Sequence, residues 1–180
     1  MAPQTATRMT YEEFMALPAD EYRRAELIEG ELVLNPAPFF RHQIIAGNIY
    51  HAFRNYLAEH RIGSTIMAPA DVVLSRENVV QPDVMVFLGE NLSMMQWKNA
   101  QRAPDIAVEV LSEGTHRHDT VTKRRLYARH GVREMWIVDP EEASVTIIRN
   151  GQEDVITDTI TTSLLPGFAM PLRDVFAEEP

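Results

Sequence analysis

Apolar residues follow a helical period in one long part of the chain. Between residues 39 and 60 they recur three or four positions apart, which predicts a long helix with one buried face. The residues that set this period are Ile45, Ile49, Phe53 and Tyr56. A second helix is predicted over residues 118–132, with Gly131 as its C-terminal stop. The capping-box spacing of residues 10–13 predicts a short helix near the N-terminus.

Short apolar runs rich in valine and isoleucine predict strands in the rest of the chain. Over residues 25–36 two such runs turn at Glu29-Gly30, which predicts an N-terminal hairpin. Other strand-like runs are STIMAPADVVL (64–74), VVQPDVMVFL (79–88), PDIAVEVLS (104–112), EMWIVDP (134–140), SVTIIRNG (144–151) and the segment around 159–164. A helical turn is expected in the last run, PLRDVF.

The runs IAVEV and MWIVD are almost continuously apolar, and one predicted helix separates them. This pattern is typical of strands buried on both faces and joined by a crossover helix. We therefore expect an α/β fold, with a mixed central sheet flanked by helices and the N-terminal hairpin beside it. The chain shows no repeat and no linker-like tract, so we expect a single domain over residues 1–180.

The composition narrows the classes of function. The formal net charge is −9, which argues against a domain that holds nucleic acid by bulk electrostatics but not against an enzyme that reaches phosphate through a metal ion. The chain has no cysteine, so disulfides and thiolate metal sites are excluded. No apolar run is long enough to cross a membrane, and the N-terminus has no secretory-type apolar segment. We expect a cytoplasmic protein.

Two carboxylates lie inside apolar runs, Asp83 in VVQPDVMVFL and Glu109 in PDIAVEVLS. A buried carboxylate costs several kcal/mol unless a cation, a raised pKa or a bound metal compensates it. If neighbouring strands bring the two together, they suit a hard cation such as Mg²⁺. The alternative for each is a structural role. Asp105 shares a strand face with Glu109, but it directly follows a proline, and a strand-start role is the alternative there.

Lys123 is the candidate cation for this site, because it lies in the helix that follows the Glu109 strand and has a long, flexible side chain. A lysine so placed could hold the attacking water or stabilise developing charge on a phosphate. The alternative is a surface ion pair with Asp119, four residues earlier on the same helix.

The chain resembles the family of Uma-type putative restriction endonucleases, within the PD-(D/E)XK nuclease superfamily. The matching segments are ELIEGELV (26–33), RHQ (41–43), QPDVMVF (81–87), APDIAVEVLS (103–112), GVREMWIVDP (131–140), LPGFAMPL (165–172) and the D-x-x-x-K-x-x-x-Y spacing of Asp119, Lys123 and Tyr127. Together and in order they span nearly all of the chain. The resemblance implies a restriction-endonuclease-like fold and Mg²⁺-dependent cleavage of DNA, with Mn²⁺ as a second candidate ion.

Carried over by position, the resemblance implies that Asp83 and Glu109 bind the metal and that the carbonyl of Val110 adds a third oxygen. It makes Glu26 and His42 additional candidates for the site. The superfamily's lysine, expected two residues after Glu109, is replaced here by leucine. In the family a lysine on the following helix takes over that role, which points to Lys123.

Two functional hypotheses remain at this point. The first is a metal-dependent endonuclease that hydrolyses DNA phosphodiester bonds, with Asp83, Glu109 and Lys123 as its catalytic residues. The second is a catalytically inactive module that keeps the nuclease fold for binding or assembly, since fold alone does not carry activity. A nuclease that cuts both strands needs two sites, so we expect a homodimer.

Overall fold

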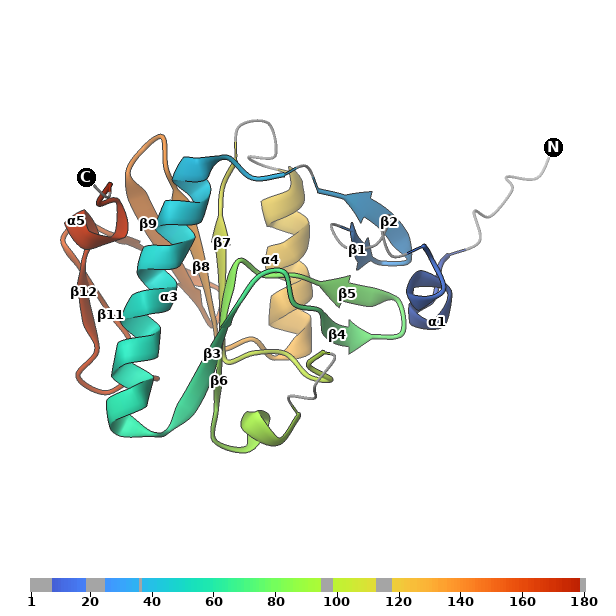
Figure 1. Cartoon of the computed structure of the whole chain (residues 1–180), viewed down its shortest axis with the longest axis horizontal. Helices are drawn as coiled ribbons and strands as arrows, with labels where there is room; N and C mark the ends of the chain where they lie inside the picture. The colour runs from blue at the N-terminus through green and yellow to red at the C-terminus, as the bar shows by residue number, and fades with distance from the viewer. Residues whose placement is uncertain (1–7, 19–24, 36, 95–98, 113–117, 179–180) are drawn as a thin grey trace.

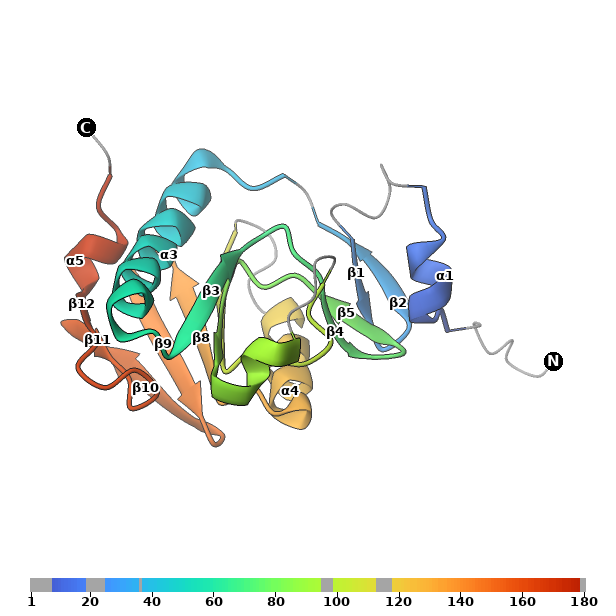
Figure 2. The same ribbon diagram turned by 60° about the horizontal axis from the view of Figure 1, so that its bottom comes forward.

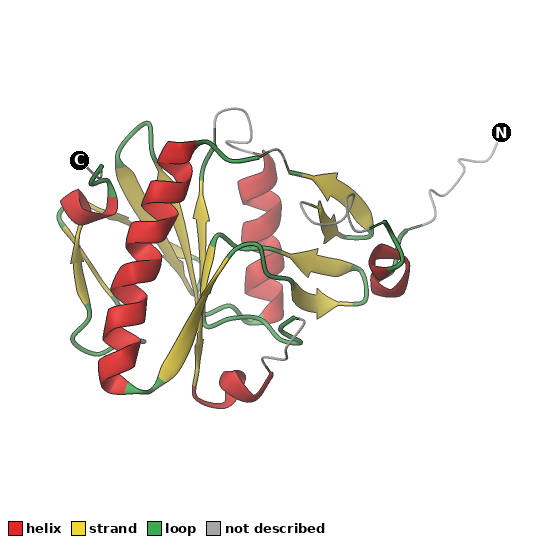
Figure 3. Ribbon diagram, in the orientation of Figure 1, coloured by secondary structure: helices red, strands yellow, loops and turns green. Residues whose placement is uncertain are grey.

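A six-stranded sheet lies between two helices in the computed structural model, which describes residues 8–18, 25–35, 37–94, 99–112 and 118–178. Helix α3 covers one face of the sheet and α4 the other (Figures 1 and 3). The helices are α1 (Tyr11–Met15), α3 (Phe40–His60), α4 (His118–His130), α5 (Leu172–Val175) and the 3₁₀ helix η1 (Gly89–Met94). In the described residues no helix is both long enough and apolar enough to cross a membrane.

The strands form three sheets. The large sheet has the order β10-β9-β8-β7-β6-β3, a second sheet has the order β2-β1-β5-β4, and β11 pairs with β12. The strands are β1 (Ala25–Ile28), β2 (Glu31–Leu34), β3 (Gly63–Met67), β4 (Val72–Ser75), β5 (Asn78–Val80), β6 (Val84–Leu88), β7 (Ile106–Val110), β8 (Glu134–Asp139), β9 (Ser144–Arg149), β10 (Gln152–Ile156), β11 (Thr159–Thr161) and β12 (Ala169–Pro171).

The large sheet is mixed, as the sequence predicts. Strands β7 and β8 are parallel and are joined through α4, whereas the other pairs in this sheet are antiparallel. Strand β7 alternates between two cores. Ile106, Val108 and Val110 pack in the core that contains α3, while Ala107 packs with Leu126 and Tyr127 of α4. Glu109, two residues after Ala107, therefore belongs to the α4 side of the sheet.

Local signals in the sequence place several element ends correctly. Thr10 and Glu13 form the reciprocal capping box at the start of α1. Gly131 has a positive φ directly after α4, and Asn150 and Gly151 both have positive φ in the turn between β9 and β10. The strand β10 itself was not predicted, because its sequence, QEDVI, is polar and mostly exposed. The three-residue strand β12 is too short to give a pattern.

The expectation that Asp83 lies within a strand is wrong. The run VVQPDVMVFL breaks at residues 81–83, and its halves, β5 and β6, belong to different sheets. Pro82 has no N–H to donate to a ladder and aspartate is a poor strand former, so the break falls at these residues. The run STIMAPADVVL divides in the same way into β3 and β4, with Pro69 in the gap. The second sheet arises from these breaks, and it lies beside the large one in Figure 2.

Candidate active site

Five charged or titratable side chains from separate parts of the chain meet beside the C-terminal end of β7. They are Glu26 of β1, His42 of α3, Asp83 in the break before β6, Glu109 of β7 and Lys123 of α4. In Figure 1 the end of β7 and the first turns of α3 and α4 lie at the same upper edge of the molecule, next to β1. The structure thus brings together the five side chains that the sequence pattern and the family resemblance named for the site, without Asp105.

Lys123 lies between two carboxylates. Its Nζ is 2.9 Å from Oε2 of Glu26 and 3.0 Å from Oε2 of Glu109. The lysine side chain is buried and that of Glu26 is completely so. Lys123 therefore reaches back to the Glu109 strand, as its position predicts. The side chain of Asp119, the alternative partner, lies outside the described residues.

Glu26 is held as an ionised acceptor. Its Oε1 accepts the backbone N–H of Gln81 at 2.7 Å, and its Oε2 accepts an N–H of the Asn35 side chain at 2.9 Å. Burial raises the pKa of Glu26, but the Lys123 ammonium and these two hydrogen bonds lower it by more. The pKa of this carboxyl group is therefore below its ordinary value, although its side chain is completely buried.

Glu109 lies in the opposite electrostatic situation. Burial raises its pKa, and the negative charges of Glu26 and Asp83 add to that effect, against the opposing effect of Lys123. The resulting pKa is about 8. Oε1 of Glu109 also accepts a hydrogen bond from the hydroxyl of Tyr127. Burial and the neighbouring Glu109 raise the pKa of Tyr127 well above its ordinary value, so this hydroxyl keeps its proton and remains a donor.

Asp83 connects the end of β7 to α3. Its Oδ2 accepts the backbone N–H of Val110 at 2.7 Å and lies 3.3 Å from Nε2 of His42. Burial lowers the pKa of His42, but Asp83 and the Val110 carbonyl raise it by more. Among the described residues, the other ring nitrogen of His42, Nδ1, is buried without a hydrogen-bond partner. No described residue donates a hydrogen bond to Oδ1 of Asp83.

The donor set suits a hard cation. Asp83, Glu109 and the Val110 carbonyl supply oxygen ligands, which Mg²⁺ and Mn²⁺ prefer. Three carboxylates face one lysine and one histidine here, and this negative charge adds to the effect of burial in raising the pKa of Glu109. In the described part of the chain no three His, Cys, Asp or Glu side chains form a metal-holding group by themselves. Two carboxylates, a carbonyl and several waters do not require one.

Other acidic residues have structural roles. Oδ2 of Asp105 accepts the backbone N–H of Leu88 at 2.7 Å and an N–H of the Asn91 side chain at 2.9 Å, so Asp105 anchors η1 rather than joining Glu109. Asp71 accepts an N–H of the Gln81 side chain at 2.7 Å. The strand-start alternative for Asp105 is therefore the correct one.

Sequence reasoning gave no role to three residues that hold the site together. Tyr127 follows Lys123 by four positions, and this spacing, which puts both on one face of α4, was an available signal. Asn35 lies just after β2 and Gln81 just after β5, and nothing in the sequence pattern marks either as a partner of Glu26.

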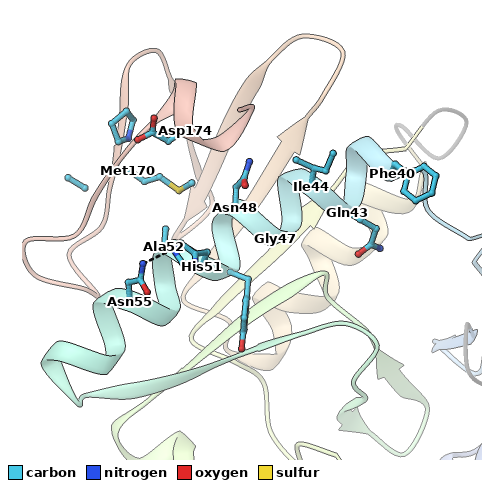
Figure 4. Close-up of a pocket in the computed structure, with 13 residues that line it drawn as sticks. Phe40, Gln43, Ile44, Gly47, Asn48, His51, Ala52, Asn55, Met170 and Asp174 are labelled. Carbon is cyan, nitrogen blue, oxygen red and sulfur yellow. Dashed lines mark hydrogen bonds between the residues drawn. The ribbon is translucent and has the colours of Figure 1, made fainter. Parts of the chain in front are cut away.

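A separate groove of about 790 Å³ runs along the outer side of α3, between that helix and the segment 169–174 (Figure 4). Asn48, His51 and Asn55 of α3 line it together with Met170 and Asp174. None of the clustered carboxylates lines this groove, so the candidate active site is a different place.

The comparison with protein families decides the identity of the chain. The model of the Uma2 family, described as "Putative restriction endonuclease", matches residues 11–173. The chain belongs to this family. The match includes all five residues of the cluster, and it confirms the resemblance found in the sequence.

A solved structure confirms the fold of this Uma2 protein. The crystal structure of a putative nuclease belonging to DUF820 from Anabaena variabilis ATCC 29413 aligns with a TM-score of 0.77 at 23% sequence identity. The alignment covers 93% of this chain and 97% of the other. No curated protein matches the sequence. The restriction-endonuclease-like arrangement of a mixed sheet flanked by helices is thus established, within a nuclease-like family.

Replacing Lys123 by methionine should destabilise the protein, because it leaves Glu26 and Glu109 buried without their shared cation. Removing one partner of a buried ion pair costs about 3–5 kcal/mol. Urea unfolding at neutral pH measures this loss. Arg129→Met on the same helix is the control, since its exposed pair with Glu29 contributes at most about 1 kcal/mol. Equal losses in the two variants would contradict the buried ion-pair network.

Stability should also depend on pH through Glu109. Its pKa is about 8 in the folded protein and near 4.5 when unfolded, so the folded state binds more protons between these values. The wild type should therefore lose stability relative to Glu109→Gln as the pH rises from 4.5 to 8. Urea unfolding of both proteins across this range, with chelator present, measures the difference. A difference that stays constant with pH would show that Glu109 titrates normally.

Proposed function

We propose that the protein is a metal-dependent endonuclease that hydrolyses phosphodiester bonds in DNA. The observation that carries the proposal is the position of Lys123. The lysine that the superfamily places two residues after the strand glutamate is absent, and the Lys123 ammonium, coming from α4, lies 3.0 Å from Glu109. The family and the fold are nuclease-like, which supports the same assignment.

Asp83, Glu109 and the carbonyl of Val110 would hold Mg²⁺, with Mn²⁺ as the second candidate. Such an ion, when bound, polarises the phosphodiester and lowers the pKa of a bound water. Asp83 has one carboxylate oxygen to which no described residue donates, and it accepts the Val110 N–H with the other. This leaves an open ligand position next to the backbone that supplies the proposed carbonyl.

The remaining side chains would prepare the site. Lys123 would stabilise the negative charge that develops on the phosphate, because its ammonium is fixed in a buried, low-dielectric place. Glu26 orients that ammonium from the other side at 2.9 Å. Tyr127 orients Glu109 through its hydroxyl, and His42 does the same for Asp83. His42 and Tyr127 are thus positioning residues in this proposal.

Cleavage of both strands of a duplex requires two such sites, and we propose a symmetric homodimer as the way to supply them. Sedimentation equilibrium of the protein alone and with DNA tests this part independently of cleavage. The second candidate function, an inactive binding or assembly module, has one specific observation in its favour. Lys123 and His42 already contact all three carboxylates, which partly neutralises them in the absence of a metal.

Metal titration distinguishes the two functions. We expect calorimetry to show Mg²⁺ or Mn²⁺ binding to the wild type and no binding to Asp83→Asn, with circular dichroism unchanged. Asp154→Asn, on the exposed strand β10, is the matched control and should bind like the wild type. Absence of binding to the wild type, even with DNA present, would favour the inactive module. Unfolding of Asp83→Asn would make this carboxylate structural.

Replacing Lys123 by arginine separates charge from position. The variant keeps a positive charge between Glu26 and Glu109, so it should fold, but the planar guanidinium cannot place that charge at the same point. We expect DNA cleavage in Mg²⁺ to fall by about 10²–10³-fold, the usual effect of losing one group that stabilises the transition state. Cleavage at the wild-type rate would remove Lys123 from the catalytic residues.

A further inference from the structure

Three large apolar side chains are exposed between the end of β2 and the start of α3. Leu34 and Phe39 are each 66% exposed, and Phe40 is 91% exposed. Most other large apolar side chains in the described residues lie in the three cores. A cluster of exposed apolar residues on one short segment usually marks a binding surface. Figure 4 shows the Phe40 ring at the first turn of α3, pointing away from the helix.

This segment is fixed to the candidate active site at both ends. Asn35, next to Leu34, donates an N–H to Glu26 at 2.9 Å. His42, in the first turn of α3, lies 3.3 Å from Asp83. The backbone of this segment therefore starts and ends next to the carboxylates, while the Phe40 side chain lines the groove on the outer side of α3. In Figure 1 the residues that lead directly into α3, 37–39, lie at the same upper edge at which β7 ends.

The charges around the two phenylalanines favour a polyanion. Arg41 is exposed, and no carboxylate of the described residues pairs with it. Phe39 is the N-cap of α3 and supplies no side-chain hydrogen bond. Within the described part of the chain, the first backbone N–H groups of this long helix therefore have no capping side chain and can meet an anion. A second apolar protein surface placed here would bury both of these donors without partners, which is unfavourable.

We propose that Phe39 and Phe40 stack on unpaired bases while Arg41 and the start of α3 contact the adjacent phosphate. The substrate class is then single-stranded DNA, or duplex DNA with unpaired bases, delivered to Asp83 and Glu109. The inference rests on the proposed nuclease function and adds a substrate class to it. Aromatic side chains beside a cationic group are the usual means of holding single strands. The whole chain has a net charge of −9, so bulk electrostatics does not attract DNA, and this local surface has to supply much of the affinity for it.

Fluorescence anisotropy with a labelled single-stranded oligonucleotide, and with the duplex of the same sequence, tests the proposal in Ca²⁺ buffer. The wild type should prefer the single strand, and Phe40→Ala should weaken that binding by about tenfold, as expected for the loss of one base–aromatic stack. Phe40→Tyr should bind like the wild type, and Phe40→Leu should bind like Phe40→Ala. Val155→Ala, which removes a side chain that is 65% exposed on β10, is the control and should change nothing.

A base analogue reports stacking directly. When the oligonucleotide carries 2-aminopurine, binding of the wild type should change the fluorescence of this base. The double variant Phe39→Ala/Phe40→Ala should leave it unchanged. Two results would overturn the inference. One is equal binding of single strand and duplex that does not depend on the phenylalanines. The other is a wild-type dimer that dissociates in the double variant in sedimentation equilibrium, which would make the surface a subunit interface.

The two proposals fail in different ways. If the protein stacks on bases but does not cleave DNA in Mg²⁺ or Mn²⁺, the base-binding surface is supported and the nuclease function is wrong. If the wild type and Phe40→Ala cleave intact duplex DNA at the same rate, the nuclease function is supported and the base-binding surface is wrong.

Discussion

The ion pairs of Lys123 connect the parts on which the candidate site depends. Glu26 belongs to the four-stranded sheet, Glu109 to the six-stranded sheet, and Lys123 to the crossover helix between β7 and β8. One buried ammonium thus joins two sheets and a helix at the point where the carboxylates converge. In a low-dielectric interior, removing this group would leave the ionised Glu26 buried without its cation and Glu109 without a hydrogen-bond donor. The same contacts of Lys123 therefore fix how the two sheets lie and where the side chains of the candidate site are placed.

Stability alone is a poor explanation for this cluster of buried charges. Buried ion pairs are often no better than apolar side chains of the same volume, because each charge loses its hydration. Here burial and two neighbouring carboxylates raise the pKa of Glu109 to about 8, a second cost. By contrast, the buried Glu134 accepts hydrogen bonds at both oxygens, from Arg149, Thr162 and Trp136. The Arg149 guanidinium balances its charge. Stability alone does not explain the excess of carboxylates at the candidate site, and the proposed metal ion would account for it.

The sequence predicts the elements better than it predicts their association. Residues 40–60 have a clear helical period and IAVEV is almost continuously apolar. Asp83 and Glu109 attract attention because carboxylates are out of place in apolar runs. Glu26 and His42 have ordinary surroundings in the sequence, and only the family resemblance marked them. The second sheet could not be predicted, because it depends on long-range pairing of β1 with β5. Asn35 and Gln81 were missed for the same reason, since their partner Glu26 is brought to them by that pairing.

The break at residues 81–83 shows how a locally unfavourable sequence positions a site. As the chain leaves β5, the N–H of Gln81 is directed at Glu26 at 2.7 Å. Pro82 cannot continue a ladder, and the next residue, Asp83, accepts the N–H of Val110 at the end of β7. Three consecutive residues thus hold one carboxylate of the four-stranded sheet and supply another to the six-stranded sheet. An uninterrupted strand would direct residues 81 and 83 to the same face of a single sheet, and neither contact would form. The interruption that the strand pattern failed to predict is what brings the carboxylates together.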